Sequence, residues 1–357
     1  MSRKALAPVW RIIKAPGRGL LTVSTGAEQQ RKLIDKFIPP RRRNSWPNYV
    51  KARLANPDKV PGPSLIGFPS DSGGGICRGA AHGPLGLRPL LYSKGWAPHD
   101  LGDIPCIPQL SHDKLLSPKQ KKACEKQLWN SSSHKTHPVS PLNLLREFLQ
   151  NGYQKQARAF KPLVLGGDHS LSLPCVEALH KSGLLKDCGI LHFDAHTDLM
   201  ETRFGVDYCF ATWASHASKL LDKPEKLLQV GLRQSSESKK HWEGKFGVKQ
   251  IWMSEVKSKT AAQLTKQICS HFEKLNCKHL YLSIDIDCLD QRQAPSTGTP
   301  ELKGMSTTYL TKVIDQVTKR FSVLGADLVE VAPVLGSKQD AQKTVKAAVQ
   351  LIEAIHW

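Results

Sequence analysis

A short run of acidic and histidine residues, Asp194-Ala195-His196-Thr197-Asp198, offers three possible metal ligands at alternate positions. It follows the apolar run Gly189–Phe193, which is typical of a short buried strand. Side chains alternate between the two faces of an extended chain, so we expect Asp194, His196 and Asp198 to point the same way. Carboxylate and imidazole groups together bind divalent cations, so the run predicts a metal site, although a polar strand end facing solvent has the same pattern.

Two further apolar runs end in residues of the same kind. Leu163–Leu165 leads into Gly166-Gly167-Asp168-His169-Ser170, and Leu280–Ile284 leads into a motif that begins with Asp285 and Asp287. In open parallel sheets, ligands bind beyond the carboxyl ends of the strands. Clustered carboxylates repel one another unless a cation lies between them, so the three strand ends predict one shared metal centre.

Five motifs together resemble the ureohydrolase (arginase–agmatinase) family, in that family's order and over roughly residues 65–357. The matching runs are Gly167-Asp168-His169-Ser170, Asp194-Ala195-His196-Thr197-Asp198, Ser283-Ile284-Asp285-Ile286-Asp287-Cys288-Leu289-Asp290, Ala294-Pro295-Ser296-Thr297-Gly298-Thr299-Pro300-Glu301 and Asp327-Leu328-Val329-Glu330-Val331-Ala332-Pro333. Independent motifs in the same order rarely coincide by chance.

The resemblance implies a centre of two Mn²⁺ ions per subunit. The ligands of one ion would be His169, Asp194, Asp198 and Asp285. The ligands of the other would be Asp194, His196, Asp285 and Asp287, so that Asp194 and Asp285 bridge the pair. The four aspartates carry four negative charges, which two divalent ions balance, and the mixture of carboxylates and imidazoles suits Mn²⁺, with Fe, Co or Zn as substitutes.

The same resemblance implies catalytic roles for two carboxylates. Two close ions share a water and lower its pKa, and Asp198 is placed to orient the resulting hydroxide and to take its proton after attack on a guanidinium carbon. Glu330 matches the carboxylate that clamps the substrate guanidinium through a bidentate pair, although a strand-end acid facing water is an alternative for this residue. We interpret Asp168 as a support of its own loop and His192 as a buried core histidine.

The sequence departs from the family where many members carry a proton-relaying histidine. Tyr208 occupies that position, and a phenol of pKa about 10 transfers protons near neutral pH less readily than an imidazole does. Three alternatives remain open: His216 replaces the missing histidine, the leaving group needs less help, as for the family's formimino substrates, or activity is low. The arginase loop that binds the α-carboxylate and α-amino groups is not evident over residues 199–220, whereas Gly298–Glu301 is of the agmatinase type.

These features predict a binuclear manganese hydrolase that cleaves a C–N bond of a linear guanidino or amidine compound, releasing urea after attack by a metal-bridging hydroxide. Agmatine-like or guanidino-acid substrates are favoured over free arginine. The alternatives are a formiminoglutamase-like hydrolase and a metal-bound, weakly active regulatory protein.

The elements that position these residues alternate between strand and helix. Strands are expected near residues 64–69, 100–104, 163–165, 189–193, 227–231, 250–252, 280–287 and 323–331. Helices are expected near residues 87, 141–154, 170–185, 236–246, 261–275, 305–321 and 338–356, with one more in a polar surface segment over 109–140. This alternation predicts an α/β fold with three α/β/α layers around a mostly parallel sheet, the arginase-like fold, as one catalytic domain over residues 61–357.

The chain carries 51 Lys and Arg against 31 Asp and Glu, a net charge of +20. Residues 1–60 form a basic extension with fourteen Lys and Arg but three Asp and Glu. Such a charge is typical of a solvated surface or a subunit contact, and polyanion binding is the alternative. No aromatic residue lies among Arg41, Arg42 and Arg43, so we expect no nucleic-acid partner. Nine scattered cysteines without a C-x-x-C pair, and no run of about 18 apolar residues, favour a cytoplasmic protein without a membrane span. The resemblance implies a homo-oligomer, either a trimer or a hexamer.

Overall fold

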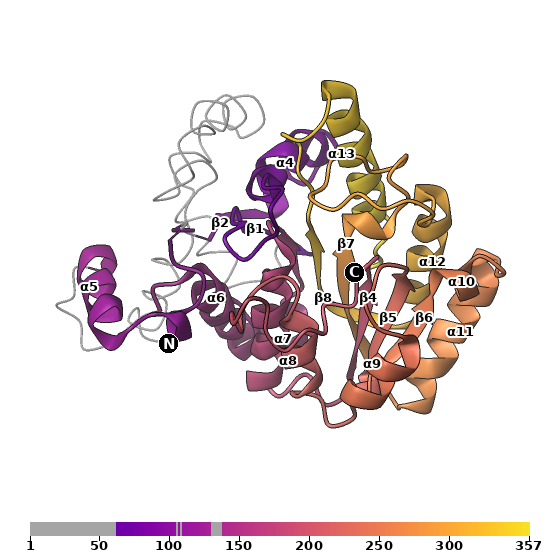
Figure 1. The fold of residues 1–357 in the computed structure, drawn as a ribbon, viewed down its shortest axis with the longest axis horizontal. Helices are drawn as coiled ribbons and strands as arrows, with labels where there is room; N and C mark the ends of the chain where they lie inside the picture. Colours follow the sequence, from indigo (N-terminus) through magenta and orange to yellow (C-terminus); the bar gives the residue numbers. More distant parts are fainter. Residues whose placement is uncertain (1–61, 105, 108, 130–137) are drawn as a thin grey trace.

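The structure, a computed structural model, describes residues 62–104, 106–107, 109–129 and 138–357 (Figure 1). The basic extension predicted over residues 1–60 lies outside these residues, and the division into an extension and one catalytic domain stays a prediction. Within the described ranges, no helix has both the length and the apolar character needed to cross a membrane.

The centre of the molecule is a single parallel sheet of eight strands, which confirms the predicted fold class. The strands are β1 Ser64–Gly67, β2 Asp100–Asp103, β3 Pro162–Leu165, β4 Cys188–Phe193, β5 Leu227–Leu232, β6 Lys249–Trp252, β7 His279–Asp285 and β8 Ser322–Val329. Their order across the sheet is β2-β1-β3-β8-β7-β4-β5-β6. The inner strands are buried along their length, as expected for a parallel sheet covered on both faces.

Helices cover both faces of the sheet and complete the three layers. They are α4 Gly83–Ser93, α5 Pro118–Trp129, α6 Pro141–Gln156, α7 Ser172–Lys181, α8 Trp213–Ser218, α9 Lys239–Phe246, α10 Met253–Val256, α11 Ala261–Lys274, α12 Thr307–Arg320 and α13 Lys338–Glu353. Figure 1 shows α4, α13, α12 and α11 along one side of the sheet and α6, α7, α8 and α9 along the other. Helix α5 stands apart from these layers, as predicted for the polar segment that contains it.

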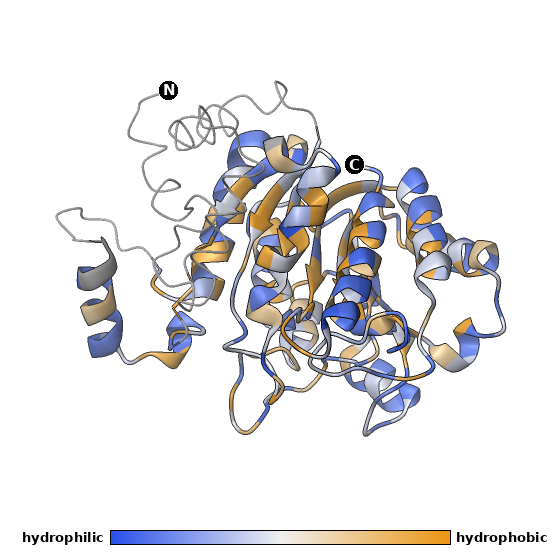
Figure 2. Ribbon diagram, turned by 90° about the horizontal axis from the view of Figure 1, so that it is seen from above, coloured by the Kyte–Doolittle hydropathy of each residue, from blue (hydrophilic) through white to orange (hydrophobic). Residues whose placement is uncertain are grey.

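The long helices form because their sequences combine an apolar stripe with a capping residue. Thr260, Ser306 and Ser337 cap α11, α12 and α13 by accepting a backbone N–H in the first turn. The apolar stripes face the sheet: Figure 2 shows hydrophobic residues along the strands and on the helix faces turned toward them, with hydrophilic residues outside. Packing of these stripes holds the strands in their order.

The strand order decides where the predicted site residues meet. Strands β7 and β8 lie between β3 and β4, although β3 and β4 are closer together in the sequence. The neighbouring carboxyl ends of β3, β8, β7 and β4 are followed by His169, Glu330, Asp287 and Asp194, respectively, and Asp285 is the last residue of β7. All the predicted carboxylate and histidine ligands therefore come from one edge of the sheet.

A buried ion-pair cluster joins α4 to the outer strand β2. Arg88, only 1% exposed, donates to Asp100 Oδ2 at 2.7 Å and lies 2.6 Å from Asp103 Oδ1. Gly67 of β1 faces the same cluster, where an added Cβ would lie 1.8 Å from Asp103 Oδ1. The acidic residues of β2 therefore hold the fold together and lie outside the predicted metal centre.

Candidate metal centre

The Asp194–Asp198 run is not extended, so the predicted strand-like alternation is wrong in its local conformation. Strand β4 ends at Phe193, and Asp194 Oδ1 accepts the backbone N–H of His196 at 2.6 Å. Asp198 has a left-handed φ of 51°. An aspartate can bond to the backbone two residues ahead and so replaces the strand with a turn. The side chains still converge, but a tight turn brings them together.

The same turn occurs after the two other strands that deliver ligands. Asp285 Oδ1 accepts the N–H of Asp287 at 2.8 Å, so β7 ends at Asp285 and not at residue 287 as expected. Asp168 Oδ1 accepts the N–H of Ser170 at 2.9 Å and its Oδ2 accepts from Gly73 at 3.1 Å. The interpretation of Asp168 as a support of its own loop is therefore confirmed.

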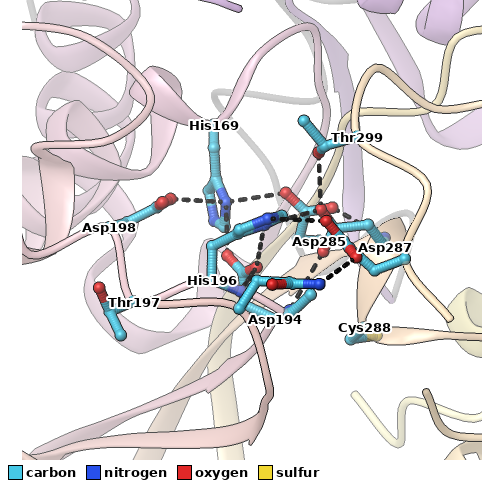
Figure 3. A network of polar contacts seen from close by, with 12 residues as sticks. His169, Asp194, His196, Thr197, Asp198, Asp285, Asp287, Cys288 and Thr299 are labelled. Carbon is cyan, nitrogen blue, oxygen red and sulfur yellow. Dashed lines mark hydrogen bonds and ion pairs between the residues drawn. The ribbon is translucent and has the colours of Figure 1, made fainter. Parts of the chain in front are cut away.

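The first ligand group surrounds one nitrogen of His169, shown in Figure 3. Its Nδ1 lies 3.2 Å from Asp194 Oδ2, 3.2 Å from Asp198 Oδ2 and 3.1 Å from Asp285 Oδ2. Three carboxylate oxygens and one imidazole nitrogen thus face a common point. His169 is fully buried, so bulk water does not screen these charges.

The hydrogen bond made by the other ring nitrogen of His169, Nε2, indicates whether Nδ1 carries a hydrogen or a lone pair. Ser283 Oγ donates to Asp327 Oδ1 at 2.9 Å and lies 2.9 Å from His169 Nε2, so it accepts the hydrogen of that nitrogen. A neutral His169 therefore directs the lone pair of Nδ1 at three carboxylates, and this nitrogen has no hydrogen-bond partner among the described residues. Such an arrangement is repulsive unless a cation lies among the four atoms, so a divalent metal ion fits this group.

The second ligand group is built around His196 and shares Asp194 with the first. His196 Nδ1 lies 3.0 Å from Asp287 Oδ2 and 3.5 Å from Asp194 Oδ1. Thr299 Oγ1 donates to Asp287 Oδ2 at 2.9 Å and the N–H of Ala195 donates to Asp287 Oδ1 at 3.1 Å, so the Asp287 carboxylate is oriented on both sides. The two oxygens of Asp194 thus face different groups, which suits a ligand shared by two ions.

The pKa values of the two ligand groups are shifted in the direction that favours bound protons or cations. Burial opposes a charge on His169, but Asp194, Asp285 and Asp198 outweigh it and raise the pKa of the imidazole well above its usual value. Burial and the negative charge of Asp194 raise the pKa of Asp198 to about 8. Burial, followed by the charges of Asp287 and Asp194, raises the pKa of Asp285 well above its usual range. Protons or metal ions must therefore occupy the cluster.

A model of the arginase family matches residues 62–357, most of the chain. The chain belongs to the arginase family. Members of this family are metal-dependent hydrolases that act on amidino C–N bonds. The family match and the two ligand groups agree, because a metal-dependent hydrolase needs a cation site at the edge of the sheet where these groups lie.

Individual relatives lie at moderate distance. This arginase-family chain is 28% identical over 284 residues to a guanidinobutyrase from Pseudomonas aeruginosa, which covers 76% of this chain and 78% of that one. It is 32% identical over 209 residues to an agmatinase from Blochmanniella floridana, which covers 58% of this chain and 63% of that one. The solved structure of an arginase from Bacillus subtilis has a TM-score of 0.61 at 25% identity, covering 82% of this chain and 97% of that one.

Glu330, predicted to clamp a substrate guanidinium, lies next to the first ligand group. Its Oε1 accepts the backbone N–H of His169 at 3.0 Å, and its backbone has a left-handed φ of 61°. Burial, followed by the charge of Asp168, raises the pKa of Glu330 well above its usual range. Asp198 and Glu330, the two carboxylates given catalytic roles, thus both have strained backbones, a feature common at functional sites.

Tyr208 and His216 lie together, but their polar atoms are engaged elsewhere. The Tyr208 ring stacks on His112 at a centroid distance of 3.8 Å and on His216 at 5.1 Å. Lys114 Nζ donates to Tyr208 Oη at 2.8 Å, and His216 Nε2 donates to the Asp207 carbonyl at 2.8 Å. Among the described residues, neither side chain hydrogen bonds to the predicted ligands, and a catalytic role for either stays a prediction.

The sequence analysis gave no role to several residues that orient the ligands. Trp213 Nε1 donates to Asp198 Oδ2 at 2.9 Å, and Asp327 receives hydrogen bonds from Ser283, Ser172 and Tyr281. Ser283 shares strand parity with Asp285 and could have been suspected on that ground. No local signal marks Trp213, because α8 approaches Asp198 only in the folded chain.

Proposed function

We propose that this chain is a hydrolase with two Mn²⁺ ions per subunit that cleaves a C–N bond of a linear guanidino or amidine compound. One observation carries the proposal: two groups of carboxylates and imidazoles share Asp194, and Glu330 is anchored on the amide of His169 beside them. The ligands proposed are His169, Asp194, His196, Asp198, Asp285 and Asp287. Their mixture of hard oxygens and imidazole nitrogens suits Mn²⁺.

Each part of the proposed site has a distinct task. When bound, a pair of divalent ions supplies a nucleophile by lowering the pKa of water toward neutrality. Asp198 accepts one hydrogen bond from Trp213 and thereby presents its carboxylate to the reacting water and to the proton that leaves it. Breakdown of the tetrahedral carbon then releases urea and an amine.

Glu330 supplies the charge that selects the substrate. Its Oε1 is used by the amide of His169, whereas its Oε2 lies on the side of Gly298, where an added Cβ would be 3.8 Å away. A guanidinium or amidinium group pairs well with a carboxylate held in this way, and its charge offsets the cost of burying Glu330. Glycine at position 298 lets the Cys77 carbonyl approach this part of the site, since an added Cβ would lie 2.9 Å from that oxygen.

The substrate class follows from the relatives together with the sequence. A guanidinobutyrase and an agmatinase are among the similar chains, and the Gly298–Glu301 run is of the agmatinase type. Agmatine-like compounds and guanidino acids are therefore our leading substrates, ahead of free arginine. The test is a screen of the Mn²⁺-loaded protein for urea and ammonia release over guanidino and formimino compounds. Urea from agmatine or guanidinobutyrate supports the proposal, and no product from any compound contradicts it.

The contacts of Tyr208 favour a second candidate function. Tyr208 Oη accepts from Lys114 and His216 Nε2 donates to the Asp207 carbonyl, so among the described residues neither group is held against the predicted ligands as a proton donor to a strongly basic leaving amine. A formiminoglutamase-like reaction, whose leaving group needs less help, or a metal-bound regulatory role with low activity fits these contacts. Formamide as the product in the same screen would identify the first of these alternatives.

The shared ligands offer a direct test of the two-ion arrangement. Asp285 lies beside His169 in the first group, and its role as a bridge to the second ion is part of our proposal. We expect Asp285→Asn to lose bound metal, as determined by elemental analysis. A variant that still binds two ions per chain contradicts a bridging role for Asp285.

We further propose that the protein is cytoplasmic and forms a homo-trimer or hexamer without a nucleic-acid partner. The oligomer is supported by the family resemblance, and the basic extension over residues 1–60 is a candidate subunit contact. Light scattering of the full chain tests the assembly. Salt-dependent retention on a polyanion column would contradict the absence of a nucleic-acid partner.

A further inference from the structure

Three buried polar side chains, those of His192, Gln229 and Gln250, lie on neighbouring strands of the sheet, and we call them the polar row. In the backbone register, His192 of β4 pairs with Gln229 of β5, which pairs with Gln250 of β6. Their side chains are 0%, 0% and 2% exposed. A polar side chain buried at such positions destabilises the fold unless its hydrogen bonds are made. The reaction proposed above uses none of these three residues.

The hydrogen bonds of the polar row run in one direction. An indole N–H can only donate, and Trp252 Nε1 donates to Gln250 Oε1 at 2.9 Å. Gln250 therefore presents Nε2 to Gln229, whose Oε1 accepts at 2.9 Å. Gln229 Nε2 then donates both its hydrogens, one to the Thr197 carbonyl at 2.6 Å and one to His192 Nδ1 at 3.0 Å. The carbonyl of Thr197 and the indole of Trp252 orient the two amides independently.

The direction of the row determines the tautomer of His192. Because Nδ1 accepts from an amide, the ring hydrogen lies on Nε2, which donates to Asp194 Oδ2 at 2.8 Å. Neither nitrogen then has a lone pair left for a cation. His192 is therefore excluded as a ligand, although one of its ring nitrogens lies within 4.8 Å of ligand atoms of His169, Asp194 and Asp198. The buried histidine predicted here thus has a specific task.

We propose that His192, Gln229 and Gln250 are positioning residues that set the direction in which Asp194 offers its carboxylate to the metal ions. This inference rests on the proposed function, in which Asp194 is the shared ligand. The His196 amide holds Oδ1 and the His192 ring holds Oδ2, so the rotation of the carboxylate is fixed on both sides.

The polar row also contacts the turn over Asp194–Asp198, which carries three of the proposed ligands. Gln229 holds the carbonyl of Thr197, which lies between His196 and Asp198. The sheet supplies the rigidity, because the three positions of the row are in register on neighbouring strands. Hydrogen-bond partners of metal ligands typically change metal affinity by roughly 10–100-fold when removed.

The first experiment measures the tautomer of His192 by NMR of the metal-free protein with ¹⁵N-labelled histidine. We expect hydrogen on Nε2 only. In Gln229→Met, which keeps the side-chain length but loses the amide donor, we expect the hydrogen to stay on Nε2, because Asp194 Oδ2 still accepts it, and the ¹⁵N resonance of Nδ1 to move, because that nitrogen loses its hydrogen bond. A ring that carries its hydrogen on Nδ1 in the unmodified protein overturns the proposal, as does an Nδ1 resonance that Gln229→Met leaves unchanged.

The second experiment measures Mn²⁺ affinity by titration calorimetry. Gln229→Met and His192→Phe are each expected to weaken binding by roughly tenfold or more. The control is Gln267→Met on α11, outside the row, which is expected to keep the affinity within about twofold. Unchanged affinity in both row variants overturns the proposal, and if Gln229→Met does not fold, His192→Phe decides.

A third variant, Asp194→Asn, distinguishes failure of the proposed metal centre from failure of the positioning role of the polar row. If Asp194→Asn leaves Mn²⁺ affinity unchanged, the proposed metal centre fails and the role of the row fails with it. If Asp194→Asn loses the metal while His192→Phe keeps it, the metal centre stands and only the positioning role is overturned.

Discussion

At the scale of the residue, the metal centre is a set of acids that cannot all be charged unless cations are present. Asp194 keeps its charge, because its contacts with His169, His192 and His196 overcome its burial and hold its pKa well below the usual range. Its charge in turn makes ionisation of Asp198 and Asp285 costly. Protons and metal ions therefore compete for the same positions.

This competition predicts how metal binding depends on pH. In the metal-free protein, burial and then the charge of Asp194 raise the pKa of Asp198 to about 8. Burial lowers the pKa of His196, but the carboxylates of Asp287 and Asp194 outweigh it and raise that pKa to about 12. A metal ion must displace these protons, so its affinity is expected to rise between about pH 6 and pH 8, by about tenfold per pH unit for each proton released. Calorimetry in two buffers of different ionisation enthalpy measures both the affinity and the protons released. Equal affinity across this range contradicts the prediction.

The contact between Trp213 and Asp198 gives a second prediction at this scale. Trp213→Phe removes the indole donor that lies 2.9 Å from Asp198 Oδ2 but keeps an aromatic ring against His169. We expect Mn²⁺ affinity to fall by roughly tenfold, because Asp198 loses the bond that orients it.

Trp242 provides the matched control for this variant, since it is also buried and its Nε1 donates to Ser235, which belongs to neither ligand group. Calorimetry on Trp242→Phe is expected to return the affinity of the unmodified protein. Equal losses in the two variants would mean that tryptophan content, and not the bond to Asp198, is responsible.

At the scale of the element, buried charge joins α4 to β2. We expect Arg88→Met to lower the free energy of unfolding by about 3–5 kcal/mol, because Asp100 and Asp103 then stay buried without their cation. Urea denaturation measures the loss. Arg146→Met is the control, since Arg146 and Glu177 are each about one-fifth exposed and such a pair is worth about 1 kcal/mol or less. A similar small loss in both variants would show that the buried cluster adds nothing.

At the scale of the whole molecule, the proposed metal centre joins three strand ends, those of β3, β4 and β7, whose ligands span residues 169–287 of the chain. A metal that binds the folded chain at 100 to 1,000 times its Kd stabilises it by about 2.7–4.1 kcal/mol. We therefore expect EDTA to lower the Tm of the Mn²⁺-loaded protein by about 4–6 °C, measured by calorimetry. Asp194→Asn, which removes the shared ligand, is expected to show a much smaller effect of EDTA. An unmodified protein whose Tm does not change with EDTA contradicts the proposed centre.

The chemistry of the site was predictable because it depends on side chains that lie next to strand ends in the sequence. The motifs around His169, Asp194 and Asp285 named the ligand types, and the alternation of strands and helices predicted the parallel sheet that collects them. Where the prediction was wrong, as for the extended run after Phe193, a local hydrogen bond from Asp194 competed with the strand geometry.

Only the tertiary structure decided which strands are neighbours and which side chains lie behind the ligands. The entry of β7 and β8 between β3 and β4 brings His169 to Asp285, and the register of β4, β5 and β6 places His192, Gln229 and Gln250 in one row. Periodicity reports which face of an element is buried, but strand order and register depend on packing between residues far apart in the chain. The sequence alone therefore indicated the candidate ligands, and the folded sheet specified how these side chains are held.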